Sequence, residues 1–268
     1  MKTQLNAALL FALFCAANPL TSQSAQPLVQ AHAHNDYLHP HPLFDALEHG
    51  FCSVEADIHL VNGQLLVAHD LAKTKPERTL QALYLDPLRQ LVKKNGGRVY
   101  PHGPEFTLLI DLKGNWKILY PPLRAALTNY GDMLTTFQGS TKQTKAVLVI
   151  ITGNRDRTMF GGETVRYAGF DGELTDLEQA PDASFAPWIS TKWSDHFTWR
   201  GTGVMPEAEL KQLGNIVSKA HAQKRRVRFW DAPDNSAGWQ TMLAAGVDLI
   251  NTDDLSGVEK LLLKRQGR

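Results

Sequence analysis

Two pairs of charged residues, Glu55 with Asp57 and Asp111 with Lys113, interrupt apolar runs with a spacing of two. On a β-strand this spacing points both side chains to the same face. Converging carboxylates repel one another and are costly to bury, and a divalent cation relieves both problems. Oxygen ligands without cysteine favour Ca²⁺ or Mg²⁺ over zinc. Glu55, Asp57 and Asp111 are therefore candidate metal ligands. The alternative from spacing alone is a structural ion pair between Asp57 and Lys113.

Histidine is concentrated in the same part of the chain, where seven of the ten histidines lie between residues 32 and 69. The imidazole titrates near neutral pH and suits general acid and base catalysis. We expect His34 and His69 to form an acid–base pair around the carboxylates. His32 faces the same way as His34 and is the alternative base, and either histidine could instead be a hydrogen-bonded structural residue. Three others are expected at the surface: His39, His41 and His49.

The position of His69 depends on a hairpin. Asn62-Gly63 between apolar runs predicts a two-residue turn. In a regular ladder Ala56 then pairs with His69, whose side chain would lie on the face opposite the carboxylates. For His69 to join them, the hairpin must contain a bulge or open before that residue. Otherwise Asp70 is the rival for that place.

Other polar and aromatic residues near predicted strand ends are candidates for substrate binding. Lys113 could hold a phosphate oxygen, Trp230 could wall the pocket, and Asn35 adjoins His34. The alternatives are a solvated lysine and a core tryptophan. Arg155 and Arg157 could also meet a phosphate, although a solvated loop charge is the default expectation.

Short apolar runs alternate with helical patterns from residue 27 onward. Eight strands are predicted, at 28–33, 53–59, 106–112, 146–152, 164–168, 188–190, 227–230 and 249–251. Helices are predicted at 42–49, 80–94, 116–130, 206–223, 236–245 and 255–264. This alternation in roughly 240 residues predicts a single-domain (β/α)8 TIM barrel over 26–268, with reactive groups at the carboxyl ends of the strands. No GxGxxG follows the first strand, which argues against a dinucleotide cofactor.

The first 25 residues are typical of a secretory signal peptide. Lys2 precedes an apolar run at 7–17, and cleavage is expected after Ser24 or Ala25. The run is shorter than the ~20 residues that span a bilayer, so we expect an exported protein, periplasmic or secreted, with no integral membrane segment after cleavage. Cys52 then stands alone and cannot form an internal disulfide. The net charge of +1 gives no reason to expect nucleic acid as a partner, and the sequence leaves the oligomeric state open.

Several motifs occur together in the order of a known superfamily. His34-Asn35, Glu55-x-Asp57, His69-Asp70 and the LIDLK of 109–113 resemble the phosphodiesterases that include glycerophosphodiester phosphodiesterases, sphingomyelinase D and phosphatidylinositol phospholipase C. The GVDLINTD of 246–253 resembles the closing strand of that superfamily. HNDY at 34–37 followed by PLFDAL at 42–47 resembles its altered-inheritance-of-mitochondria branch most closely.

The resemblance implies a TIM barrel, a Ca²⁺ or Mg²⁺ ion on the three carboxylates, and His34 and His69 as acid and base. Glycerophosphodiesterases usually have His-Arg in place of His34-Asn35, and Glu in place of Asp111, which leaves specificity for glycerol open. The expected function is metal-dependent hydrolysis of a small phosphodiester or a lipid head group. The alternatives are a binuclear amidohydrolase or a PHP-type phosphatase, using His32-x-His34 and Asp253, or a catalytically inactive exported barrel.

Overall fold

The computed structural model describes residues 25–179 and 181–267. The predicted signal peptide therefore lies outside the described residues except for its last position. Among the described helices, none has both the length and the apolar character needed to cross a membrane.

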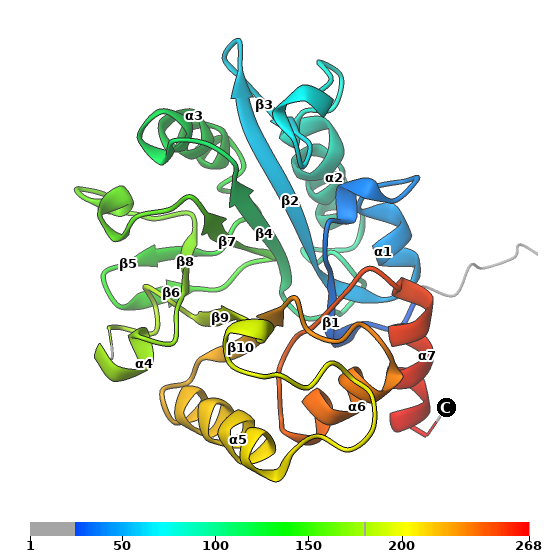
Figure 1. The fold of residues 1–268 in the computed structure, drawn as a ribbon. Coiled ribbons are helices and arrows are strands. Elements are labelled where there is room, and N and C mark those ends of the chain that lie inside the picture. Colours follow the sequence, from blue (N-terminus) through cyan, green and yellow to red (C-terminus); the bar gives the residue numbers. More distant parts are fainter. Residues whose placement is uncertain (1–24, 180, 268) are drawn as a thin grey trace, which may run out of the picture.

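Eight parallel strands form a near-closed barrel with helices around the outside (Figure 1). In chain order they are β1 (Leu28–Ala33), β2 (Phe51–Val61), β4 (Phe106–Leu112), β7 (Val147–Gly153), β8 (Gly169–Gly172), β9 (Trp188–Lys192), β10 (Arg226–Trp230) and β11 (Ile250–Thr252). β1 pairs with β11, and a single bridge between Arg228 and Leu249 joins the β10 side to the β11 side. The prediction of a single-domain TIM barrel is confirmed.

Helices and short strands complete the domain. The helices are α1 (Phe44–Glu48), α2 (Asp86–Lys94), α3 (Trp116–Asn129), α4 (Asp176–Gln179), α5 (Glu207–Ala222), α6 (Ser236–Ala244) and α7 (Leu255–Arg265). A π-helical turn, Gln81–Leu85, leads directly into α2, so together they fill the helix predicted at 80–94. Strand β3 (Gln64–Val67) pairs with β2, and β5 (Thr136–Gln138) pairs with β6 (Thr141–Gln143).

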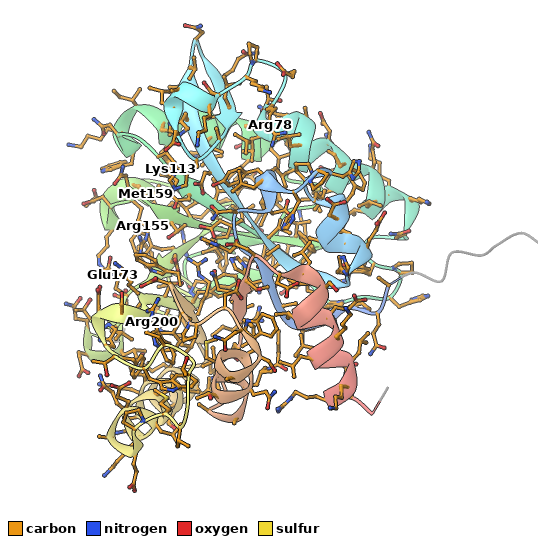
Figure 2. All side chains as sticks on the ribbon, turned by 45° about the vertical axis from the view of Figure 1, so that its right-hand side comes forward. Arg78, Lys113, Arg155, Met159, Glu173 and Arg200 are labelled. Atoms are coloured by element: carbon orange, nitrogen blue, oxygen red, sulfur yellow. The ribbon has the colours of Figure 1, made fainter. Side chains whose placement is uncertain are left out.

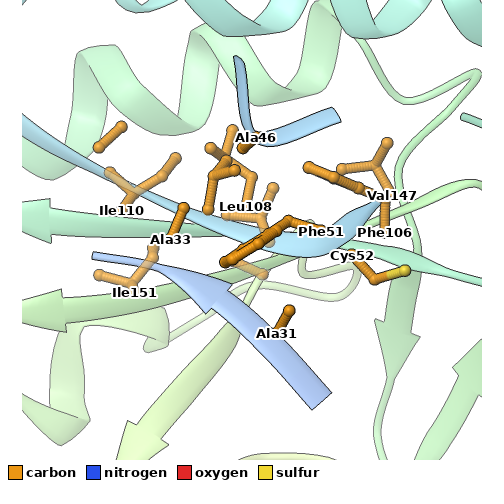
Figure 3. Packing of buried hydrophobic residues seen from close by; sticks show 14 of the residues in the cluster. Ala31, Ala33, Ala46, Phe51, Cys52, Phe106, Leu108, Ile110, Val147 and Ile151 are labelled. Atoms are coloured by element: carbon orange, nitrogen blue, oxygen red, sulfur yellow. The ribbon is translucent and has the colours of Figure 1, made fainter. Parts of the chain in front are cut away.

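Alternation along the strands divides each one between the two sides of the barrel wall. In β4, Leu108 and Ile110 belong to the main core between the strands and the helices, whereas Leu109 belongs to a smaller inner cluster. Figure 3 shows side chains of the main core, among them Phe51 of β2, Ile151 of β7 and Ala46 of α1. By the same alternation, Asp111 faces inward near the carboxyl end of β4.

One strand prediction is wrong. The fifth strand is β8 at Gly169–Gly172, not 164–168. Arg166 instead forms an antiparallel bridge with Phe137 beside the barrel. Glycine usually marks a turn, but a Cβ on Gly169 would lie 2.9 Å from Pro187. Here glycine permits a close approach of two chain segments. The other seven strands lie within two residues of their predicted bounds.

Candidate active site

Three carboxylates meet at the carboxyl end of the barrel. Glu55 and Asp57 come from β2, and Asp111 comes from β4, where Asp57 and Asp111 are direct partners in the strand register. One oxygen from each carboxylate lies within 4.8 Å of the others. In the described part of the chain, this is the one group of three or more potential ligands with such spacing. The residues predicted as metal ligands are therefore brought together.

The environment of these carboxylates fits a hard cation. Asp57 Oδ1 and Asp111 Oδ1 are buried, and neither has a hydrogen-bond partner among the described residues. Burial, together with the negative charges of Glu55 and Asp111, raises the pKa of Asp57 to about 6. Burial also raises the pKa of Asp111. Oxygens that are buried, unpartnered and repelled by like charges are suitable ligands for Ca²⁺ or Mg²⁺.

Lys113 contacts the other oxygen of two of these carboxylates. Its Nζ lies 3.0 Å from Asp57 Oδ2 and 2.9 Å from Asp111 Oδ2. Burial lowers the pKa of Lys113, but the two carboxylates outweigh burial and raise it, so the side chain stays charged. The ion pair that the spacing left as an alternative is thus present. It occupies the Oδ2 atoms and leaves both Oδ1 atoms to a cation.

His34 lies beside the carboxylates and is oriented from behind by Asp253. Its Nδ1 lies 2.9 Å from Asp253 Oδ1, just after β11. Burial lowers the pKa of His34, but the bond to Asp253 and the charge of Glu55 outweigh this effect and raise it. The amidohydrolase alternative requires Asp253 as a metal ligand, but here its carboxylate contacts the His34 ring. Asn35, at φ 49°, lies next to His34, and its Oδ1 is 2.6 Å from the Tyr37 hydroxyl.

His69 reaches the same cavity because the hairpin ends early. The ladder between β2 and β3 is regular to Val67, and Ala68 N still donates to Asp57 O at 3.1 Å. The chain then leaves the ladder, so His69 does not pair with Ala56. Its Nδ1 lies 2.9 Å from Asp70 Oδ1. The hairpin thus opens before His69, as the prediction required. Asp70 does not take the place of His69 but contacts its ring.

These side chains line one cavity of about 530 Å³ at the mouth of the barrel. Both histidines contribute to it, as do two of the three carboxylates, and all three predicted substrate-binding residues do so: Asn35, Lys113 and Trp230. The Trp230 side chain is 41% exposed, so it is a wall and not part of the core.

Arg155 also lines the cavity. Its Nε donates to the backbone oxygen of Asp171 at 2.7 Å, and its guanidinium lies 4.9 Å from the Phe170 ring centre. Figure 2 shows Lys113 and Arg155 along the same edge of the molecule. Arg157, the other candidate arginine, does not line the cavity and pairs with Asp176.

His32 lies outside the cavity and is completely buried. Its Nδ1 lies 2.6 Å from Ser53 Oγ, and its Nε2 lies 3.1 Å from Arg228 Nη1. Burial lowers the pKa of His32 to about 4, so the ring is neutral at physiological pH. Both ring nitrogens are occupied, which argues against His32 as the base and against a His-x-His metal site.

Arg228, in β10, is a site residue that sequence reasoning missed. Its Nη1 lies 3.2 Å from Glu55 Oε2 and 3.0 Å from Asn251 Oδ1. Burial alone would raise the pKa of Glu55, but Arg228 and His32 outweigh it and hold the pKa well below its usual range. A signal was present in the sequence, because Arg228 alternates with Val227 and Phe229 and so faces inward.

The family of the chain follows from comparison with known proteins. A model described as "AIM6-like phosphodiesterase domain" matches residues 21–171, which is more than half of the chain. The chain belongs to this family. A second model, "Glycerophosphoryl diester phosphodiesterase family", matches residues 226–256.

Fungal proteins are among the curated relatives of this AIM6-like domain. Altered inheritance of mitochondria protein 6 from Eremothecium gossypii is 28% identical, over 87% of this chain and 69% of that protein. A homologue from Arthroderma benhamiae is 27% identical, over 86% of this chain and 83% of that protein.

Solved structures share the fold of the AIM6-like domain. A glycerophosphodiester phosphodiesterase from Parabacteroides distasonis has a TM-score of 0.54 at 14% identity, covering 90% of this chain and 100% of that one. One from Agrobacterium tumefaciens has a TM-score of 0.50 at 14% identity, covering 87% of this chain and 100% of that one. At these identities the likeness supports the barrel architecture alone.

Proposed function

We propose that this AIM6-like domain is a metal-dependent phosphodiester hydrolase that uses two histidines as general acid and base. The observation that supports the proposal most directly is that His34, His69, Glu55 and Asp111 line one cavity, with Asp57 beside them. The substrate would be a small phosphodiester or a lipid head group. A diester needs this combination of charge neutralisation and two proton transfers.

Glu55, Asp57 and Asp111 would hold a Ca²⁺ or Mg²⁺ ion. Such an ion, when bound, neutralises charge on the non-bridging oxygens of the phosphate. Lys113 keeps two of the carboxylates together through their Oδ2 atoms and places an ammonium group at the cavity wall. The chain itself thus contributes a fixed positive charge to the phosphate site.

The two histidines carry matching partners. Asp253 contacts Nδ1 of His34, and Asp70 contacts Nδ1 of His69. A carboxylate at Nδ1 favours the tautomer with its proton there and leaves Nε2 to exchange a proton with the substrate. One imidazole would take a proton from the attacking water or substrate hydroxyl as its P–O bond forms. The other would protonate the leaving alkoxide as the second P–O bond breaks.

The test is hydrolysis of bis-p-nitrophenyl phosphate with Ca²⁺ or Mg²⁺, with EDTA as control. We expect His69→Ala, which removes a general acid or base, and Glu55→Ala, which removes a metal ligand, each to lower turnover at least ~100-fold, while circular dichroism shows a folded barrel. His41→Ala, an exposed histidine outside the cavity, is the matched control and should keep its activity. Wild-type turnover in both site variants would refute the assignment.

We also propose that residues 1–25 direct export to the periplasm or medium. Expression of the full chain in a bacterial host tests this by N-terminal sequencing of the exported product. A mature protein beginning at residue 25 or 26 is expected. Retention of an uncleaved chain in the cytosol would contradict the proposal.

A further inference from the structure

A second hollow of about 400 Å³ adjoins the active-site cavity. The two share Thr152, Arg155 and Trp230 as a common wall. Glu173 also lines the second hollow, where its Oε1 lies 3.5 Å from Arg155 Nη2, and the two residues lie along the same edge of the molecule (Figure 2). A phosphodiester carries an alcohol group on each side of its phosphorus. A phosphate in the first cavity would therefore direct one of those groups across the shared wall.

The floor of the second hollow is a buried carboxylate with an unused oxygen. Asp171, in β8, is 1% exposed. Ser190 Oγ donates to its Oδ1 at 2.6 Å, but its Oδ2 has no hydrogen-bond partner within the described residues. Arg228 Nη2 is 4.0 Å from Oδ2, too far for a hydrogen bond. Buried acceptors without a donor are rare in folded proteins, so this oxygen is a candidate to accept a hydrogen bond from a ligand in the hollow.

The residues that line the hollow include both hydrogen-bond donors and acceptors. Thr175, Thr191 and His196 line the hollow, and His196 Nε2 lies 2.8 Å from Thr191 Oγ1. Carboxylates and cations are mixed at the rim, so no single charge dominates: Glu173, Asp195, Arg155 and Lys192. This chemistry matches a group with several hydroxyls, each of which both donates and accepts.

The same hollow is poorly suited to a quaternary ammonium group. Such cations are recognised by cages of aromatic faces. Among the described residues that line the hollow, Trp230 is the sole tryptophan, tyrosine or phenylalanine. Lys192 Nζ lies 5.5 Å from the centre of the Trp230 ring, so a cation already adjoins that face.

We propose that this hollow is the subsite for a polyhydroxylated alcohol arm of the diester, with Asp171 Oδ2 accepting a hydrogen bond from one of its hydroxyls. The assignment rests on the proposed phosphodiesterase function for its biological meaning. It makes Asp171 and His196 specificity-determining residues, which act on the alcohol and not on the phosphorus.

The direct test is calorimetric binding of two matched probes, myo-inositol 1-phosphate and phosphocholine, in the presence of Ca²⁺ or Mg²⁺. The wild type should bind the inositol probe at least tenfold more tightly. In Asp171→Asn, the ratio of the affinity for the inositol probe to that for phosphocholine should fall about tenfold, as expected for loss of one hydrogen bond to a charged group. His196→Ala, a change at a half-buried residue, provides a second variant if the first does not fold. Asp132→Asn makes the same chemical change at an exposed ion pair and should preserve the preference.

Equal binding of the two probes by the wild type would overturn the inference, and so would an equal loss for both probes in each folded variant. Turnover of bis-p-nitrophenyl phosphate, which has no polyol, separates this result from the proposed function. Diester hydrolysis without a preference for inositol refutes the subsite alone. A preference for inositol without hydrolysis of any diester refutes the phosphodiesterase alone and leaves a polyol-phosphate binding site.

Discussion

Arg228→Met should lower the free energy of unfolding by about 3–5 kcal/mol, the usual effect of removing one partner of a buried ion pair. The side chains of Arg228 and Glu55 are only 4% and 7% exposed, and their closest atoms lie 3.2 Å apart. The same guanidinium contacts His32 and Asn251. Methionine occupies similar space but leaves the Glu55 carboxylate buried without its cation. The unpaired buried charge accounts for most of the expected loss of stability.

Urea unfolding and thermal melting, both followed by circular dichroism in the presence of EDTA, measure this effect. For a domain of this size, ~1 kcal/mol corresponds to about 2–4 °C, so the melting temperature should fall by about 6–20 °C. Arg89→Met is the matched control. Arg89 pairs with Asp132 at 2.9 Å, but the two side chains are 35% and 46% exposed, and such a surface pair contributes about 0–1 kcal/mol.

A double variant tests the reason for the loss. If the cost comes mainly from the unpaired Glu55 carboxylate, Arg228→Met combined with Glu55→Leu should recover part of the stability, because Glu55 then no longer leaves a buried charge, whereas Asp171, 4.0 Å from Arg228 Nη2, still loses its cation. The double variant would still lack metal-dependent activity, because Glu55 is a proposed metal ligand. A gain in stability without a gain in activity would therefore separate the two roles of Glu55. The reasoning fails if Arg228→Met is no less stable than Arg89→Met, or if the double variant recovers nothing.

Three further changes probe other parts of the barrel. Burial raises the pKa of Asp36 from 3.8 to about 6, so the wild type should lose up to about 3 kcal/mol as the pH rises through 6, and Asp36→Asn should lack this loss in urea titrations at pH 4 and 7. Asp253→Asn should lower the pKa of His34 and move its limb of the pH–rate profile to lower pH. Gly153 has φ +76°, and a Cβ there would overlap Oδ1 of Asp111, a proposed metal ligand. Gly153→Ala should therefore weaken Ca²⁺ binding at least ~10-fold, whereas Gly139→Ala, where a Cβ would meet no other atom, should not. Parallel pH curves, an unmoved limb or an unchanged affinity would contradict these expectations in turn.

The local alternation of side chains could be predicted well from the sequence. Two charged residues spaced by two in an apolar strand point to the same face. In a barrel that face must be the inner one, since the outer face of each strand packs against helices. This constraint alone is enough to bring Glu55, Asp57 and Asp111 to one place. The turn at Asn62-Gly63 likewise set the strand register, which is regular from Val61 to the end of β3.

The end of a ladder is harder to predict than its register. Pairing rules say which residues would face each other, but not where the two chains separate. Here the segment after Val67 turns toward the barrel mouth, and His59 Nε2 lies 3.2 Å from the backbone oxygen of His69. That contact joins residues ten positions apart on either side of a hairpin, so no local pattern reveals it.

Asp171 and Arg228 could not be assigned for a related reason. Arg228 Nη2 lies 4.0 Å from Asp171 Oδ2, but β9 and α5 lie between their two strands in the chain. An Asp-Gly pair such as Asp171-Gly172 is by itself more typical of a turn than of a strand. Only the closed barrel places Ser190 and Arg228 beside it.

The net charge of the carboxylate cluster at the barrel mouth determines whether it attracts or repels a phosphodiester. The three carboxylates Glu55, Asp57 and Asp111 form ion pairs with two cations, Lys113 and Arg228, so this cluster of five groups carries one net negative charge without metal. A phosphodiester also carries one negative charge and would be repelled. A divalent ion changes the balance to one positive charge, which matches the diester. Removing metal should therefore abolish substrate binding as well as turnover, a loss that competition by a non-hydrolysable phosphonate diester would detect.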